Sequence, residues 1–253
     1  MKAVFKGYIS FGLVNVPVKL YSAVEARAIN FRLLHKKDNS PIHYKRICNQ
    51  CKQEVAWKDV VKGVEYAKNK FFPVPPETLE KLKPEKSDYI DIVEFVDANA
   101  IDPIYFDKHY FVAPEKQKEK AYFLFREVLQ ATAKIAVGRM VMREKEYVIA
   151  IESYKKGMLL TTLNYAYEIR DINKIEELKT APKLTAEQLN LAKELINKLY
   201  EEEFDINKFK DTFAEQLKEV IKKMAKGRKI KIKKAKKLKK QPLMKALKAS
   251  LEK

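Results

Sequence analysis

The chain has 253 residues, 46% of them hydrophobic, which is enough to build a globular core. Lysine and arginine number 52 against 34 aspartates and glutamates, so the formal net charge is +18 and we expect an anionic partner. The absence of any run of eighteen uncharged apolar residues, of a signal peptide in residues 1–10 and of more than two cysteines argues against a membrane protein and a secreted disulfide framework, so we expect a cytoplasmic protein.

Short runs of β-forming residues, separated by turn signals, occupy much of the first 167 residues. They cover residues 13–20, 29–34, 89–96, 105–112, 140–151 and 158–167. Within residues 89–96 apolar and polar side chains largely alternate, as in a strand with one buried face. Several short strands at such spacing are typical of a barrel, so we predict an α+β, mainly β fold with a β-barrel core.

Two helices are predicted to interrupt these strands. The first covers residues 75–82 and opens with two prolines, at positions where a missing N–H costs nothing. The second covers residues 117–133 and has a body rich in Leu, Phe and Ala. Between them, the pair Asp102 and Pro103 predicts a turn.

Beyond Pro182 the hydrophobic period becomes helical. Residues 185–188 have capping-box spacing, and apolar residues follow at steps of three and four as far as Leu199. A second helix is predicted from near Asn207 to a C-terminal glycine at Gly227. Its apolar stripe needs cover, either from the barrel or from a second copy of the chain. We assign four residues of the stripe to a dimer interface: Phe209, Phe213, Leu217 and Ile221.

Residues 222–240 form a strongly basic block. Twelve of these nineteen residues are Lys or Arg and none is acidic. Such a block either contacts phosphates without regard to sequence or serves as a solubilising tail, and we favour nucleic acid. A membrane is the weaker alternative, because the apolar residues in the block are too sparse to form a face. The candidate DNA contacts here are Lys222, Lys223, Lys226, Arg228, Lys229, Lys231, Lys233 and Lys234.

The last twelve residues predict a short helix beyond this charged tether. Four apolar residues share one face of it: Leu243, Met244, Leu247 and Leu251. A helix of this length is marginal alone. We interpret it as a docking peptide that folds on its partner, with a frayed tail and intramolecular packing as the alternatives.

The sequence contains no recognisable catalytic constellation. His35, His43 and His109 fall in no metalloprotease, deaminase or triad-type motif, and no Gly-rich phosphate loop or nucleotidyl-transfer lysine motif occurs. Acidic residues such as Asp88 and Asp91 beside the predicted strands are typical of solvated faces and turns. We therefore expect a protein that is not an enzyme and has no cofactor.

Cys48 and Cys51 form the one metal-like pattern, because two thiolates at this spacing can bind one side of a tetrahedral zinc. Two further ligands are missing, and only His43 or the same pair from another subunit could supply them. Two reduced thiols at a turn are the simpler interpretation, and we assign no metal site.

Several ordered stretches together resemble prokaryotic Ku, the bacterial and archaeal end-binding protein of non-homologous end joining. They are residues 7–23, 44–51, 95–96, 101–107, 160–163, 168–170, 211–217 and 243–252. The last stretch is similar to the family's terminal segment, which is implicated in engaging the partner ligase. In the family the basic extension usually follows that segment, whereas here the lysines precede it.

The resemblance implies a Ku-type β-barrel core in residues 1–181, a helical dimerisation arm in 182–227, a lysine-rich linker in 228–241 and a ligase-docking segment in 242–253. It implies a nucleoid-associated, ring-shaped homodimer that binds double-stranded DNA ends without catalysis, bridges or protects them, and recruits and stimulates an ATP-dependent DNA ligase. The matched basic residues are candidates for the inner surface of the ring, against ordinary exposed charge as the alternative: Arg32, Lys36, Lys45, Arg46, Arg139 and Arg143.

Two other classes of function remain as alternatives. A general RNA-binding β-barrel protein would prefer single strands and stack aromatic side chains on bases. A nuclease would show metal-dependent turnover.

Overall fold

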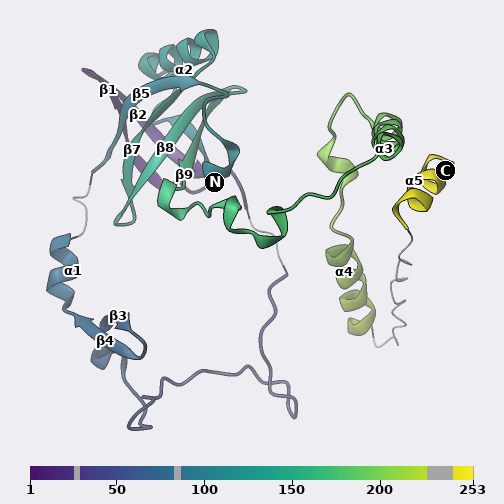
Figure 1. The fold of residues 1–253 in the computed structure, drawn as a ribbon. Helices are drawn as coiled ribbons and strands as arrows, with labels where there is room; N and C mark the ends of the chain where they lie inside the picture. Colours follow the sequence, from purple (N-terminus) through teal and green to yellow (C-terminus); the bar gives the residue numbers. More distant parts are fainter. Residues whose placement is uncertain (26–28, 83–86, 227–241, 253) are drawn as a thin grey trace. The chain divides into compact units, whose positions relative to one another are not determined.

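The computed structural model in Figure 1 describes residues 1–25, 29–82, 87–226 and 242–252. The chain divides into two compact units, the first comprising Met1–Arg27 and Phe31–Arg170 and the second Ala28–Asn30 and Asp171–Lys253. The strands belong to the first unit, and the last three helices belong to the second. Among the described residues, no helix is both long and apolar enough to cross a membrane.

Seven strands of the first unit close into a barrel (Figure 1). In pairing order they are β1 (Phe5–Phe11), β2 (Val14–Ser22), β6 (Phe106–Pro114), β9 (Gly157–Leu163), β8 (Lys145–Tyr154), β7 (Lys134–Met142) and β5 (Tyr89–Asp97). Neighbouring strands run antiparallel except β5 and β1, whose parallel pairing closes the barrel. The predicted barrel core is confirmed.

The approach of β1 to the start of β5 requires a residue without a side chain. Tyr8 N donates to Asp88 O at 2.8 Å, and a Cβ added at Gly7 would lie 1.9 Å from that same oxygen. No side chain tolerates such a contact. Glycine at position 7 therefore permits the pairing that turns an open sheet into a barrel.

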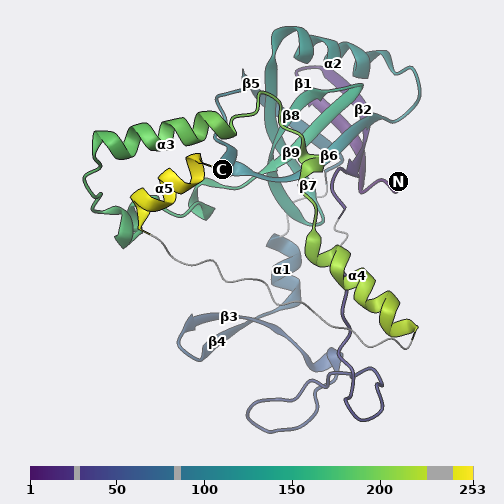
Figure 2. The same cartoon turned by 90° about the vertical axis from the view of Figure 1, so that its right-hand side faces the viewer.

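Alternation along the strands places the hydrophobic core inside the barrel. In β2, Val16, Val18 and Leu20 are fully buried while the residues between them are not. Helix α2 (Lys120–Thr132) covers one end of the barrel and packs against β2, β7 and β8 (Figure 2). The Tyr122 hydroxyl on α2 donates to Val112 O at 2.7 Å, and burial raises the pKa of this phenol. This hydrogen bond connects α2 to the C-terminal end of β6.

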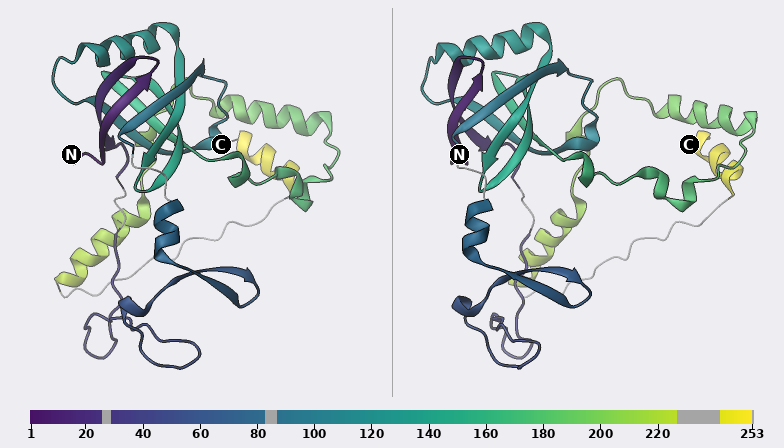
Figure 3. Two further views of the ribbon diagram at one scale, coloured as in Figure 1. Left: turned by 90° about the vertical axis from the view of Figure 1, so that its left-hand side faces the viewer. Right: turned by 60° about the vertical axis from the view of Figure 1, so that its left-hand side comes forward.

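Residues 29–82 lie between β2 and β5. This segment is called the arm, and it is distinct from the helical dimerisation arm expected in residues 182–227. The arm contains the hairpin of β3 (Lys62–Ala67) and β4 (Lys70–Val74), which leads into the short helix α1 (Pro76–Leu82), as Figure 3 shows. The predicted first helix is thus confirmed. No residue of the arm is buried. The arm has no hydrophobic core of its own.

The strand predicted over residues 29–34 is wrong. The chain there is irregular, and only Leu34 makes an isolated bridge, to Pro41. β-forming side chains alone do not make a strand, because each strand needs a neighbour that accepts and donates its backbone hydrogen bonds.

The strand predicted over residues 140–151 is instead two strands, β7 and β8, joined by a tight turn. The turn residues Arg143 and Glu144 have φ of 52° and 66°. Gly or Asn usually occupies such positions, so the sequence carried no turn signal here. The strand predicted over residues 158–167 ends at Leu163, and a 3-10 turn follows it.

Helix α3 (Ala186–Leu199) of the second unit begins where its capping box predicts. Gln188 N donates to Thr185 Oγ1 at 3.3 Å, and Thr185 N donates to Gln188 Oε1 at 2.9 Å. Short 3-10 turns elsewhere in the chain cover Trp57–Asp59, Pro103–Tyr105, Ala166–Glu168, Ile172–Lys174, Glu176–Leu178 and Ile206–Lys208.

Helix α4 (Thr212–Ala225) begins later than predicted. The Asp211 carboxylate accepts a hydrogen bond from Ala214 N at 2.9 Å and caps the helix, so Phe209 precedes α4 and does not share its stripe. The prediction overlooked this aspartate, which is a stronger start signal than Asn207. The predicted C-terminal Gly227 lies outside the described residues.

Helix α5 (Leu243–Leu251) forms where predicted and packs against α3 (Figure 3). Lys198 Nζ donates to Leu251 O at 2.7 Å, and Lys248 Nζ lies 3.3 Å from Glu187 Oε1. Leu247 is half-buried, whereas Leu243 is 57% exposed. Intramolecular packing, one of the two alternatives to docking, is therefore the arrangement in this structure.

Candidate nucleic-acid interface

The arm concentrates positive charge on a segment that has no buried residue. Its 54 residues include eleven lysines and arginines against six acidic residues. Large apolar side chains are exposed with them, including Phe31, Tyr44 and Trp57. A basic segment that has no buried residue can contact a phosphate backbone without losing packing interactions of its own.

Two turns of the arm share one hydrogen-bond pattern. In the first, His35 N donates to Ser40 O and Asn39 N donates to His35 O, both at 2.8 Å. In the second, Cys48 N donates to Gln53 O at 2.9 Å. Lys52 N completes the pattern by donating to Cys48 O at 3.0 Å. These bonds give each exposed turn a defined backbone, and the predicted contact Lys36 lies on the first of them.

Lys45 and Arg46, both predicted DNA contacts, are held beside the second turn. Lys45 Nζ lies 2.8 Å from Glu54 Oε2, and both side chains are mostly exposed. Arg46 Nε donates to Val55 O at 3.2 Å, and its guanidinium carbon lies 4.8 Å from the centre of the Trp57 ring. A guanidinium held in this way keeps its charge, and its Nη donors remain for a phosphate. Arg32 is exposed in the irregular start of the arm.

The Cys48 thiol lies at the second turn, where the backbone N–H groups of Cys51 and Gln50 lower its pKa. Cys48 is half-buried and Cys51 is exposed. In the part of the chain that the structure describes, no three His, Cys, Asp or Glu side chains gather closely enough to hold a metal ion.

Arg139 and Arg143 come from the barrel. Arg139 faces out from β7 opposite Asp91 of β5, with its Nη1 3.8 Å from Glu146 Oε1. The Glu146 carboxylate therefore partly offsets its charge. Arg143 is exposed in the β7–β8 turn. Of the two, Arg143 is the freer for a phosphate.

The basic block begins at the end of α4, where Lys222, Lys223 and Lys226 are exposed. Lys223 Nζ lies 3.6 Å from Glu219 Oε2, a surface pair that competes weakly with a phosphate. The remaining predicted contacts lie outside the described residues: Arg228, Lys229, Lys231, Lys233 and Lys234.

The predicted dimer-interface residues lack cover in the described structure. Phe209, Phe213 and Ile221 are exposed and Leu217 is half-exposed. In contrast, Met244, Leu247 and Leu251 of the predicted docking face are half-buried on α5. The apolar stripe of α4 is therefore more exposed than the apolar face of α5.

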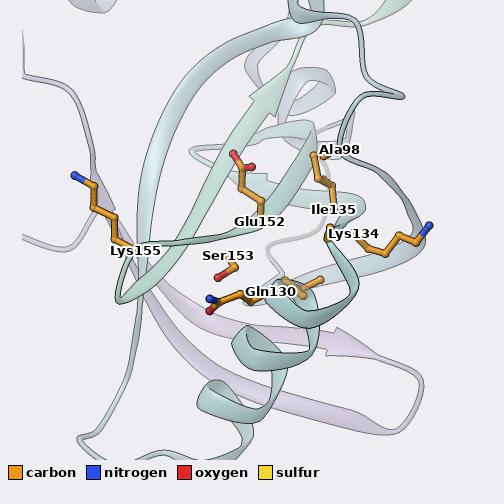
Figure 4. Close-up of a pocket in the computed structure, with 9 residues that line it drawn as sticks. Ala98, Gln130, Lys134, Ile135, Glu152, Ser153 and Lys155 are labelled. Atoms are coloured by element: carbon orange, nitrogen blue, oxygen red, sulfur yellow. The ribbon is translucent and has the colours of Figure 1, made fainter. Parts of the chain in front are cut away.

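A cavity of about 300 Å³ lies where α2 meets β7 and the end of β8. Glu152, Ser153 and Gln130 line it, while Lys134 and Lys155 point away on opposite sides (Figure 4). Lys134 Nζ is instead paired with Asp97 Oδ1 at 2.5 Å. The cavity therefore brings together neither a nucleophile and its base nor a cationic cradle for a phosphate.

A family model described as the Ku70/Ku80 beta-barrel domain matches residues 10–191. The chain is similar to the "Non-homologous end joining protein Ku" of Lachnoclostridium phytofermentans, with 39% identity over 98% of this chain and 95% of that protein. Proteins with the same name in Archaeoglobus fulgidus and Bacillus subtilis are 36% and 37% identical, covering 100% and 86% of this chain and 99% and 70% of their own lengths.

Proposed function

This chain belongs to the Ku family, and from that premise we propose that it binds the ends of double-stranded DNA in non-homologous end joining, without catalysis. The finer proposal is a ring-shaped homodimer that threads onto a duplex end and recruits an ATP-dependent DNA ligase. The observation that carries it is the arm, because a segment of 54 residues with excess positive charge and no buried residue is suited to a polyanion.

End binding by a repair protein has to ignore base sequence. Contacts to phosphates position a protein without reading bases, whereas hydrogen bonds to base edges would favour particular sequences. The exposed cations of the arm and of the α4 end are suited to the first kind of contact. Of the six basic residues predicted to line the ring, four form no ion pair with a described carboxylate and have the least competition for this role: Arg32, Lys36, Arg46 and Arg143.

A closed ring would convert topology into selectivity for ends. Such a ring can pass over a duplex only where the duplex terminates, and it can then slide inward because successive phosphates are equivalent. No bond is made or broken in this process. Its only requirements are a hole of suitable width and a positive lining.

The ring needs two copies of the chain. Exposed Phe213 and Ile221 on α4, together with the exposed aromatic side chains of the arm, would lose contact with water in such an assembly. Helix α5 is the proposed site for the ligase, with Leu243 as its most exposed apolar residue. We further propose that the lysine-rich residues 228–241 serve as the tether for this helix.

Competition between linear and covalently closed circular DNA of equal length tests the proposal. We expect linear duplex to displace a labelled duplex end, and closed circles to do so only weakly. A variant lacking residues 228–241 serves as the control, since a basic tether binds DNA of any topology. Equal affinity of this variant for both forms would contradict threading.

A further inference from the structure

An apolar groove of about 450 Å³ lies on the barrel where β6, the β8–β9 turn and the start of α2 meet. Phe111 of β6 and Tyr154 of β8 stack with ring centres 6.1 Å apart and line the groove. Phe123 of α2 and Met158 of β9 also line it. The groove is therefore shaped by flat apolar side chains and can accept another aromatic ring.

Two lysines follow Tyr154 directly and stand at the rim of this groove. Lys155 Nζ lies 5.4 Å from the centre of the Tyr154 ring. No acidic side chain within the described residues forms an ion pair with Lys155 or Lys156. An apolar slot with two uncompensated cations beside it favours an occupant that carries an aromatic side chain next to carboxylates.

The second unit contains one segment with that chemistry. Glu201, Glu202 and Glu203 are the only run of three acidic residues in the sequence, and Phe204 follows them. All four are exposed, Phe204 to 78%. Glu201 is paired with Lys208 at 3.4 Å, whereas Glu202 and Glu203 form no ion pair with a described residue.

We propose that Phe204 of one copy inserts into the groove of a second copy, with Glu202 and Glu203 facing Lys155 and Lys156. This inference rests on the proposed homodimer and names one of its contacts. On one side Phe204 is adjacent in sequence to Glu202 and Glu203, and on the other side Tyr154 is adjacent to Lys155 and Lys156. The short distance between ring and charges on both sides would allow the aromatic contact and the ion pairs to form together.

A second copy suits this groove better than DNA does. An acidic, aromatic segment in a chain of net charge +18 is repelled by phosphates and attracted to lysines. In a symmetric dimer the contact is made twice, so two grooves and two phenylalanines are covered by one assembly. The groove then lies outside the DNA channel, and its lysines serve assembly.

Charge reversal on each side tests the contact in the full-length chain. One variant carries Glu202→Lys and Glu203→Lys, and the other carries Lys155→Glu and Lys156→Glu. Each variant alone would oppose like charges at both contacts, and we expect its dimer to dissociate about tenfold more readily or worse, measured by sedimentation. An equimolar mixture would pair opposite charges at both contacts, and we expect mixed dimers of wild-type stability.

Mixing also separates a second copy from the chain's own groove. If the segment docks within its own chain, mixing restores nothing, while one chain carrying all four reversals recovers; this result would overturn the proposal. Loss of DNA affinity in the lysine variant with an unchanged dimer would overturn it in favour of a DNA strand as occupant. Unchanged dimers in both variants would overturn it outright.

Two controls keep the proposal distinct from the proposed function. Glu176→Lys with Glu177→Lys changes the charge of the second unit equally and should leave the dimer intact, as should Lys2→Glu with Lys6→Glu on the barrel. A wild-type chain that stays monomeric with and without a short duplex would contradict the ring itself. A wild-type dimer that is indifferent to both charge reversals would contradict only the groove contact.

Discussion

The barrel and the arm from Phe31 onward belong to one compact unit, yet they are built in opposite ways. In β2 alone three side chains are fully buried, whereas in 54 residues of the arm none is. The inward-facing apolar side chains of the barrel bury one another in a shared core, so the barrel has an internal source of stability. The arm leaves Phe31, Tyr44 and Trp57 exposed, and the proposed assembly on DNA would cover them. A region with its own buried core and a region without one therefore occur in the same chain.

The largest difference should appear in the free energy of unfolding. Leu20→Ala in the barrel, where Leu20 is fully buried, should lower it by about 2–5 kcal/mol because a cavity replaces the side chain. The same substitution at Leu33, 62% exposed in the arm, should change it by about 0.5 kcal/mol or less. Urea unfolding followed by circular dichroism at one protein concentration measures both.

Tryptophan fluorescence would report on the wrong region, because the only tryptophan, Trp57, lies in the arm. A cost at Leu33 as large as that at Leu20 would erase the distinction, since it would mean that the arm is packed in the free protein.

The next effect concerns DNA. Replacing Lys36, Lys45 and Arg46 by alanine should weaken binding to a linear duplex and reduce the slope of log affinity against log salt by about 2.7, about 0.9 for each lost phosphate contact. Fluorescence anisotropy across a salt series gives the slope. As the matched control, alanine at Lys2, Lys6 and Lys108 of the barrel should leave it nearly unchanged. If the two triple variants reduced the slope equally, the arm would be no more important for DNA binding than other basic parts of the surface.

A smaller effect is expected at α5, which is both packed on α3 and proposed to bind the ligase. Leu243→Asp changes an exposed residue, so it should reduce stimulation of the cognate ligase about tenfold and leave DNA binding intact. Ala249→Asp adds the same single negative charge at another exposed position of α5 and serves as the control. Full stimulation by the Leu243 variant would rule out its face of α5 as the docking site.

The smallest effect is chemical and lies within the arm. The N–H groups of Cys51 and Gln50 lower the pKa of Cys48, so Cys48 carries more thiolate than an ordinary cysteine at pH 7 to 8. We expect iodoacetamide to modify Cys48 several-fold faster than Cys51, as followed by peptide mass spectrometry of partly labelled protein. The advantage should shrink as the pH rises through the range in which an ordinary cysteine becomes a thiolate. Preferential labelling of Cys51 at pH 7 would show that exposure outweighs the hydrogen bonds.

Several elements could be predicted from sequence because their signals are local. The alternation of residues 89–96 predicts β5, and the capping box at Thr185 predicts the first residue of α3. The surroundings of the six basic residues predicted to line the ring, by contrast, depend on neighbours that are distant in the sequence. Asp91 opposite Arg139 and Trp57 beside Arg46 became apparent only in the folded chain.

The sequence by itself determined the barrel class, the start of α3 at its capping box, the excess of positive charge and the resemblance to Ku, because each can be recognised in the chain without knowing which distant segments meet. Only the tertiary structure decided that β1 pairs in parallel with β5, that residues 29–34 find no neighbouring strand, that α5 lies on α3 and that the arm has no core. Each of these depends on which distant segments meet, and a hydrogen bond or a buried side chain is defined by its partner as much as by itself.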